Sequence, residues 1–337
     1  MSAGSTSGEG GMGFPMTHRR SRAVLALLAL LASALVAAGC GSSSNSGSSG
    51  GSSSSSSSGS SSQPGKGKPA ITIGTKDFTE EFVLGQLYAQ ALKAKGYTVK
   101  LKENIGATEI VDKALTSKTI DAYPEYTGVS LSVVAKNDKL TKSPQETADL
   151  VKAFYAKRGQ VVSSLTPFQD TDAIAGLKKF VTDNNLTQVS DLAKLKSFTL
   201  GARPEFKSRF NGLKGMASVY GVKNAKFKQL ALGLQYPSLD KGDVDVVNVF
   251  STDAQLSTGK YALLKDPKGV FGFQNVYFVI NKDKYDALGG QTFMDVIDSV
   301  NKLLTGQAMQ TMNAAVDLDK QDPAAVAKSF LQANKLI

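Results

Sequence analysis

The residues that most often carry out catalysis are nearly absent from this chain of 337 residues. It contains one histidine, His18, one cysteine, Cys40, and no tryptophan. Both residues lie near the start, so the rest of the sequence offers no imidazole base, no thiol nucleophile and none of the usual zinc ligands. We therefore expect no disulfide, no metal ion and no cofactor. A hydrolase built on Ser–Lys or on paired carboxylates remains an open alternative.

Motifs and charge narrow the class of protein further. From Ala70 onward there is no GxSxG nucleophile elbow, no GxxxxGK[ST] phosphate loop and no HExxH zinc motif. The formal net charge is +10, but the lysines are scattered and do not form a stripe interleaved with aromatic residues. We therefore predict no binding to nucleic acid.

The N-terminus has the pattern of a secretory signal. Arginines at 19–22 precede an apolar run at 23–38, which is too short to span a bilayer comfortably. Small residues then lead to Cys40, and this resembles the lipobox of bacterial lipoproteins, although Ala37 stands where a leucine is usual. We expect a signal peptide at residues 1–39 and lipidation of Cys40. An unlipidated signal peptide or an uncleaved anchor are the alternatives.

A tract of nearly pure serine and glycine follows, from Gly41 to Ser62. Such a composition buries no apolar surface and is typical of disorder. With Cys40, we predict a flexible tether over residues 40–69, with a reach on the order of 30 Å.

Strand and helix patterns alternate from Ala70 to the C-terminus, which predicts an α/β fold made of two units with a helical tail. The predicted strands are 71–74, 97–101, 120–123, 197–201, 227–230, 244–250 and 276–280. The predicted helices are 79–95, 108–115, 236–241, 286–304 and 323–334, and helical turns broken at Gly212 are predicted over 204–220. In open α/β sheets ligands bind beyond the carboxyl ends of the strands, so we expect the binding residues in the loops that follow them.

Several motifs occur in an order that resembles the osmoprotectant-binding family of ABC importers, which capture glycine betaine, choline and carnitine. They are ITIGTKDFTE at 71–80, GATE at 106–109, DAYPEYTG at 121–128, PEFKSR at 204–209, GDVDV at 242–246 and STD at 251–253. The resemblance implies a two-lobed periplasmic-binding-protein-like fold of type II with a cleft between the lobes. Lobe 1 would comprise residues 70–168 and 270–337, and lobe 2 residues 169–269.

The resemblance also implies how a ligand carboxylate is held. The family's anchoring lysine and arginine fall on Lys76 and Arg209. An arginine presents a planar fork to a carboxylate and a lysine adds a point charge, so the pair suits an anionic group. The alternative is that both are ordinary surface cations.

The family's aromatic box for the cationic end is only partly retained. Tyr126 matches, and Phe250 stands at a second aromatic position. Two further tyrosines of the family fall on Asp172 and Gln274. A trimethylammonium group donates no N–H hydrogen bond, and each buried polar group left unpaired would cost about 1–3 kcal/mol. We therefore expect either a solute with N–H or hydroxyl donors, or a betaine-like solute whose missing ring comes from elsewhere.

Phe271, Phe273 and Tyr236 are the candidates for that ring. The predicted function is the extracytoplasmic, lipid-anchored solute-binding component of an ABC importer. We expect it to be a monomer that delivers a small zwitterion to a membrane permease served by a cytosolic ATPase. It is not itself that ATPase, because it lacks the phosphate loop. The alternatives are an altered ligand class, such as an amino acid, a guanidino acid or a polyhydroxylated solute, an envelope hydrolase, and a structural lipoprotein.

Overall fold

The computed structural model describes residues 63–337, which belong to one compact unit. The predicted signal peptide and Cys40 lie outside these residues. Within the described part of the chain, no helix combines the length and the apolar character needed to cross a membrane. Residues 63–69, expected to end the tether, form turns, and the Gly65 amide donates to the Lys95 carbonyl at 3.0 Å. Gly65 packs so closely on Tyr97 that a side chain there would clash, so this end is part of the folded unit.

Five strands form the first sheet, in the order β2-β1-β3-β10-β4. They are β1 (Ile71–Gly74), β2 (Val99–Lys102), β3 (Ala122–Tyr126), β4 (Gln160–Val162) and β10 (Val276–Asn281). β1 is parallel to β2 and β3, whereas β10 is antiparallel to β3 and β4. Along β10, Phe278 joins one hydrophobic core and Tyr277 joins another. Because successive side chains of a strand point to opposite faces, both faces of this sheet are covered.

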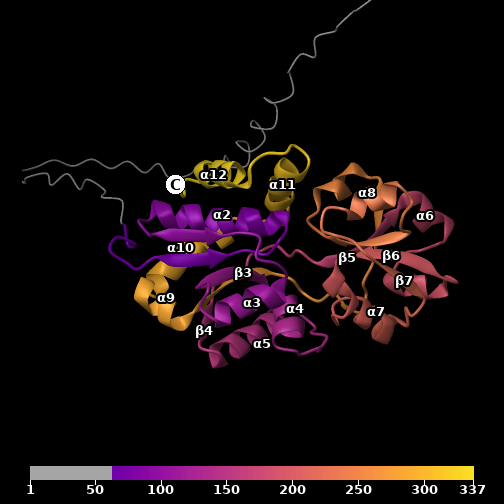
Figure 1. Ribbon diagram of the computed structural model, residues 1–337, viewed down its shortest axis with the longest axis horizontal. Coiled ribbons are helices and arrows are strands. Elements are labelled where there is room, and N and C mark those ends of the chain that lie inside the picture. Colours follow the sequence, from indigo (N-terminus) through magenta and orange to yellow (C-terminus); the bar gives the residue numbers. More distant parts are fainter. Residues whose placement is uncertain (1–62) are drawn as a thin grey trace, which may run out of the picture. The chain divides into compact units, whose positions relative to one another are not determined.

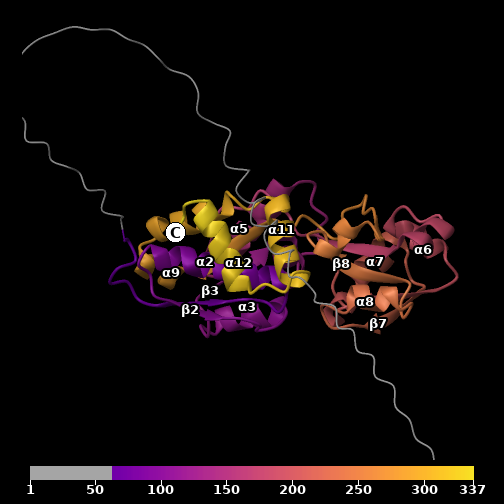
Figure 2. The ribbon, with the colours of Figure 1, turned by 90° about the horizontal axis from the view of Figure 1, so that it is seen from above.

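Helices cover the two faces of the first sheet (Figure 1). One core unites the sheet with α2 (Thr79–Ala94), α9 (Lys282–Leu288), α10 (Gln291–Asn301), α11 (Gly306–Asp317) and α12 (Pro323–Ala333). The other unites it with α3 (Thr108–Thr116), the short helix η2 (Ser130–Val134) and α5 (Pro144–Lys157). Figures 1 and 2 both show α12 lying along α2, and the two are in extensive contact. The C-terminal helices thus complete the first sheet's core.

The second sheet has the same design, in the order β7-β6-β8-β5-β9. Its strands are β5 (Asp172–Leu177), β6 (Phe198–Ala202), β7 (Ala225–Gln229), β8 (Val246–Phe250) and β9 (Tyr261–Leu264). β6 is parallel to β7 and β8, and β5 is antiparallel to β8 and β9. The helices α6 (Lys178–Asp183), α7 (Leu213–Tyr220) and α8 (Gln235–Asp240) pack around it. The predicted pair of α/β units is therefore present.

Two segments connect the sheets. The chain leaves β4, enters β5, and returns from β9 to β10. The two connections meet at an antiparallel bridge between Gln169 and Asn275, beside which the Asp170 amide donates to the Gln274 carbonyl at 3.1 Å. The connections therefore run side by side as a short two-stranded ribbon.

The observed elements confirm some predictions and add others. The helical turns expected over 204–220, with a break at Gly212, are a short turn, η4 (Pro204–Lys207), and the separate helix α7, so the predicted break is confirmed. A side chain at Gly212 would collide with the Phe206 carbonyl, so the chain turns sharply there. The strands β4, β5 and β9 and the helix α5 were not predicted. Helix α5 has a clear start signal, because the Ser143 hydroxyl accepts from the Glu146 amide and Pro144 occupies the first turn.

Candidate functional site

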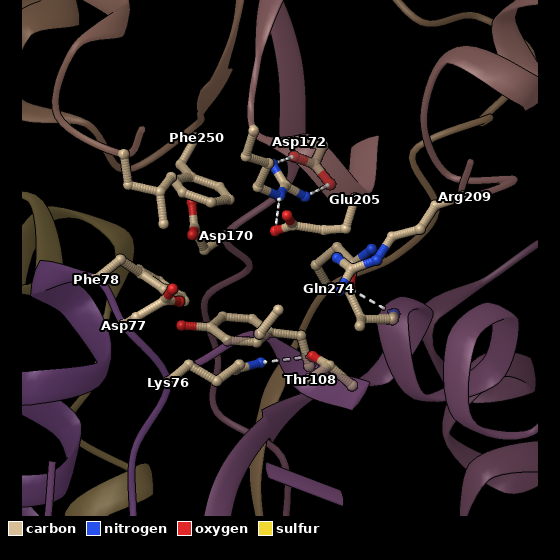
Figure 3. A pocket seen from close by; sticks show the side chains of 15 residues that line it. Lys76, Asp77, Phe78, Thr108, Asp170, Asp172, Glu205, Arg209, Phe250 and Gln274 are labelled. Carbon is tan, nitrogen blue, oxygen red and sulfur yellow. Dashed lines mark hydrogen bonds and ion pairs between the residues drawn. The ribbon is translucent and has the colours of Figure 1, made fainter. Parts of the chain in front are cut away.

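One pocket brings together residues that follow four parallel strands of the two sheets (Figure 3). Lys76 follows β1 and Tyr126 ends β3 in the first sheet, and Arg203 follows β6 and Phe250 ends β8 in the second. The carboxyl ends of parallel strands share one edge of a sheet, so each sheet presents its residues at one place. All six residues predicted from the sequence line this pocket: Lys76, Tyr126, Asp172, Arg209, Phe250 and Gln274.

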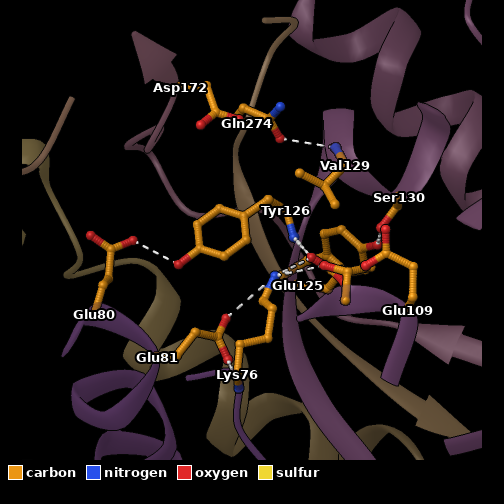
Figure 4. A network of polar contacts seen from close by, with 12 residues as sticks. Lys76, Glu80, Glu81, Glu109, Glu125, Tyr126, Val129, Ser130, Asp172 and Gln274 are labelled. Carbon is orange, nitrogen blue, oxygen red and sulfur yellow. Dashed lines mark hydrogen bonds and ion pairs between the residues drawn. The ribbon is translucent and has the colours of Figure 1, made fainter. Parts of the chain in front are cut away.

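Lys76 is enclosed by acceptors (Figure 4). Only 4% of the residue is exposed, and its ammonium pairs with Glu125 and lies 3.7 Å from Glu81 Oε1. It also donates to the Thr108 hydroxyl at 3.4 Å and lies 4.3 Å from the centroid of the Tyr126 ring. Its charge is thus compensated within the protein, and it covers one face of the Tyr126 ring.

Two glutamates behind this lysine are buried. Burial raises the pKa of Glu81 to about 8, although Lys76 opposes the shift. Burial likewise raises the pKa of Glu80, against the hydrogen bonds that it accepts. The Glu80 carboxylate accepts from the Tyr126 hydroxyl at 2.9 Å. Tyr126 is therefore fixed at both ends, by Glu80 at its hydroxyl and by the backbone of β3.

A threonine hydroxyl links Glu80 to a second buried acid. Thr252 Oγ1 lies 2.6 Å from Glu80 Oε2 and 2.8 Å from Asp170 Oδ1. Burial raises the pKa of Asp170 well above its usual value, and the neighbouring Glu80 adds to the shift. One hydroxyl has one hydrogen to donate, so the Thr252 hydroxyl donates to only one of the two carboxyl groups at a time. Glu80 also accepts from Tyr126 and Asn313, and Asp170 accepts from the Thr252 amide.

Arg203 was missed by the sequence analysis and changes the interpretation of Asp172. It donates to both oxygens of Asp172, at 2.7 and 2.9 Å, and lies 3.1 Å from Glu205. Its guanidinium also covers the ring of Phe250, 5.1 Å from the centroid. Asp172 begins β5 directly opposite Phe250 in β8, which brings the acid to the same sheet edge. The available signal was the position of Arg203, two residues after the end of a predicted strand.

The side-chain amide of Gln274 also forms its hydrogen bonds within the protein. Its side-chain oxygen accepts from the Val129 amide at 3.1 Å, and its nitrogen donates to the Phe271 carbonyl at 2.7 Å. A side chain at Gly128 would lie 2.6 Å from that nitrogen, so glycine is required for this close approach. Because Asp172 and Gln274 both have protein partners, neither needs an N–H donor from a ligand. The structure removes that argument for an altered ligand class.

The aromatic surface of the pocket has a third ring that the sequence analysis did not identify. Phe78 stacks on Phe250 with centroids 5.0 Å apart, and lies 6.1 Å from Tyr126. None of the three suggested rings lines the pocket itself. Phe271 packs in the core against Phe206, Phe273 lines another cavity, and Tyr236 packs on Tyr261 in the wall of the larger cavity described below. Phe78 stands in the matched motif, two residues after Lys76, and this position was the available signal.

Arg209 reaches across from the second sheet to the helix α3 beside the first. Its Nε and Nη2 donate to the two carboxylate oxygens of Glu109, at 3.1 and 2.6 Å. Burial of Glu109 disfavours its ionised form, but the hydrogen bonds and charge of Arg209 prevail and lower its pKa below the usual value. Arg209 is 8% exposed, whereas the side chain of Glu109 is 48% exposed.

An acidic cavity of about 320 Å³ adjoins the pocket. The two share Asp77, Phe78, Asp170, Leu232 and Phe250 in their walls. The larger cavity is also lined by Glu80, Asp253 and Asp317, with Lys320 as a cation. Burial raises the pKa of Asp253 to about 7, so its charge at neutral pH is partial. The site therefore joins a small pocket that contains arginines to a larger space rich in carboxyl groups.

Relatives of known function match nearly all of the described chain. The model of the substrate-binding domain of the ABC-type glycine betaine transport system matches residues 69–333. The glycine-betaine-binding protein of Pseudomonas aeruginosa is 30% identical over 279 residues, covering 79% of this chain and 88% of that protein. The ergothioneine transport permease/binding protein EgtU of Helicobacter pylori is 28% identical over 271 residues, covering 79% of this chain and 47% of that protein.

Solved structures agree on the fold. The crystal structure of a glycine betaine/carnitine/choline ABC transporter protein matches with a TM-score of 0.64 at 22% identity, covering 80% of this chain and 99% of that one. These relatives have two lobes of the type II periplasmic-binding-protein fold, which confirms the predicted fold class. Their family consists of extracytoplasmic solute-binding proteins of ABC importers and not of enzymes, so the predicted class of protein is confirmed. The chain therefore belongs to the family of substrate-binding domains of ABC-type glycine betaine transport systems.

Proposed function

We propose that this chain captures a small zwitterion that carries a quaternary ammonium group and a carboxylate, with glycine betaine and carnitine as the leading solutes. The observation that carries the proposal is the composition of one pocket. Three aromatic rings, Tyr126, Phe78 and Phe250, line it together with the Arg209 guanidinium. Aromatic faces attract a quaternary ammonium group, and an arginine fork matches a carboxylate.

The six predicted residues divide into two roles under this proposal. Tyr126, Phe250 and Arg209 contact the solute directly. Lys76, Asp172 and Gln274 hold the contacting groups in place, because their polar atoms already have protein partners. Lys76 supports the Tyr126 ring from one face, and Asp172 fixes Arg203 over one face of Phe250. The opposite face of the Tyr126 ring, beside the stacked rings of Phe78 and Phe250, is the surface proposed for the ammonium group.

Delivery to the membrane completes the proposed role. Lobe 1, residues 70–168 and 270–337, and lobe 2, residues 169–269, close over one solute, and the loaded form docks on a permease that works with a cytosolic ATPase. Closure reports loading only if the solute binds the closed form more tightly. A lipid on Cys40 and the Ser/Gly-rich segment would keep the monomer at the outer face of the membrane.

A second candidate is a longer betaine with N–H donors at its far end. The acidic cavity favours it, because carboxyl oxygens there accept hydrogen bonds and the cavity adjoins the pocket. Ergothioneine has this chemistry, since it joins a trimethylammonium group and a carboxylate to a ring with N–H groups. It is also the solute in the name of the H. pylori relative.

Isothermal titration calorimetry of the full-length chain in detergent would test both candidates. The panel is glycine betaine, carnitine, choline, ergothioneine and arginine. Saturable binding of glycine betaine or carnitine, with choline weaker because it lacks a carboxylate, would support the proposal. Binding of ergothioneine alone would favour the second candidate. Failure of all five solutes to bind would contradict both.

A further inference from the structure

Arg209 is the residue that we propose binds the carboxylate of the solute. In the structure, its hydrogen-bond donors are already paired with the carboxylate of Glu109. We propose that Glu109 is an internal competitor: its carboxylate binds Arg209 in the unloaded protein and must be displaced by the carboxylate of the solute. Glu109 would thereby set both the affinity and the preference for carboxylate-bearing solutes. This inference rests on the proposed function, and its test separates the two.

The geometry of the pair is that of a bound carboxylate. Nε and Nη2 of Arg209 each donate to a different oxygen of Glu109. Such a bidentate contact uses one edge of the guanidinium fully. A solute carboxylate that binds the same edge in the same manner therefore cannot coexist with Glu109 there.

The other cations of the pocket hold their partners more tightly. Lys76 is paired with buried Glu125, and Arg203 with buried Asp172, whose side chain is 3% exposed. Breaking a buried ion pair leaves an uncompensated charge and is costly, whereas an exposed pair contributes little. With 48% of its side chain exposed, Glu109 can move into water at low cost. Among the cations that line the described pocket, Arg209 is the one with a partner that is easily displaced.

The pair also joins the two lobes. Glu109 lies in the first turn of α3, beside the first sheet, and Arg209 lies between η4 and α7, beside the second. The pocket between them has a volume of about 40 Å³, which is room for only a few water molecules. A betaine or choline needs more space, so the entry of either solute requires this contact to open transiently. Choline leaves Arg209 free to pair with Glu109 again, whereas a solute carboxylate on Arg209 keeps Glu109 displaced.

The variant Glu109→Gln tests the competition, because glutamine keeps the size of the side chain and removes its charge. If Glu109 holds Arg209 nine-tenths of the time, its removal should lower the Kd for glycine betaine about tenfold. Choline has no carboxylate and needs no displacement of Glu109, so its Kd should change less than about twofold. Calorimetry on the full-length chain in detergent measures both values.

Asp112→Asn is the matched control. Asp112 lies one turn further along the same helix and pairs with both oxygens to Arg158, but this arginine follows α5 in the first lobe. The substitution removes a carboxylate–arginine pair from α3 without touching a contact between lobes. Its affinity for glycine betaine should equal that of the unmodified chain.

Three outcomes would overturn the inference: an unchanged or weaker affinity of Glu109→Gln for glycine betaine, an equal gain for choline, or the same gain in Asp112→Asn. Small-angle X-ray scattering supplies a readout without solute. Glu109→Gln should show a larger radius of gyration than the unmodified chain. If the unmodified chain binds none of the solutes, the proposed function fails. An unchanged radius of gyration in Glu109→Gln would then also show that the Arg209–Glu109 pair does not hold the lobes together.

Discussion

Two of the cations that line the pocket, Lys76 from the first lobe and Arg209 from the second, have their charges compensated in different ways. In the first lobe, Lys76 is enclosed and surrounded by Glu125 and Glu81, with Glu80 nearby. In the second lobe, Arg209 has one half-exposed partner, Glu109. A charge compensated in a dry interior holds its neighbours in place, whereas a charge with a displaceable partner is available to a ligand. Lys76 and Arg209 both match the family motif, but the different burial of their partners indicates that they have different roles.

Lys76→Met should have the largest effect, and on folding. It leaves Glu125 buried without its cation, which should lower the free energy of unfolding by about 3–5 kcal/mol. Urea denaturation followed by circular dichroism measures this loss. The double variant Lys76→Met/Glu125→Gln should regain most of the stability, because no unpaired charge remains. Equal stability of the unmodified chain and Lys76→Met would contradict the structural role given to this lysine.

Arg209→Ala should affect binding instead. Loss of its charge-assisted hydrogen bonds should weaken glycine betaine by about 100-fold, or ~2–3 kcal/mol, and choline far less. The free energy of unfolding should fall by under about 1 kcal/mol, since Glu109 is left facing water. Calorimetric titration and urea denaturation of the same preparation give both numbers. A large loss of stability with unchanged affinity would show that Arg209 has the structural role and does not bind the solute.

The pH dependence of stability should carry a contribution from Glu81. Burial raises its pKa in the folded chain to about 8 from an unfolded value of 4.5, so the folded chain binds more protons between these values. Stability should therefore fall as pH rises from about 5 to 8, with Glu81 contributing up to ~1.4 kcal/mol per pH unit. Urea denaturation at several pH values measures the slope. Glu81→Gln should show a shallower slope, and identical slopes would contradict the assignment.

Phe78→Leu should have the smallest effect. It removes one aromatic face and the stack on Phe250, so both glycine betaine and choline should weaken about fivefold, or ~1 kcal/mol. Phe273→Leu is the control, because Phe273 lines a different cavity and its replacement should leave the titration unchanged. An equal effect of the two variants would show that Phe78 acts through general packing.

The regular parts of the fold were predictable because their signals are local. The strand over Ile71–Gly74 matches its predicted bounds, and β10 is a continuous apolar run that differs by one residue at its end. β5 was missed because its alanines and Gly176 give no strand pattern. The strand is stabilised by pairing with β8 and β9, which no local signal reveals.

The residues that line the pocket could be predicted from the sequence, but the ion pairs between them could not. All six expected residues line the pocket, because five of them lie at or beside a strand end, and Arg209 follows the turn η4 that comes after β6. Their partners were not visible: Arg203 pairs with Asp172 at 31 residues' separation, and Arg209 with Glu109 at 100. Ion pairing over such distances depends on the folded arrangement. For this reason Asp172 was interpreted as an acceptor in need of a ligand.

The ribbon formed by the two connections has a mechanical consequence. Gln169 and Asn275 bridge its strands, and the Gln274 amide donates to the Gln169 side chain at 3.0 Å, so the strands bend together and cannot slide independently. Asp170 and Gln274 belong to this ribbon and also line the pocket. The wall of the pocket is therefore part of the connection between the lobes. Because a rotation displaces the most distant points most, any bending at this ribbon would move the outer surfaces of the lobes further than the residues that line the pocket.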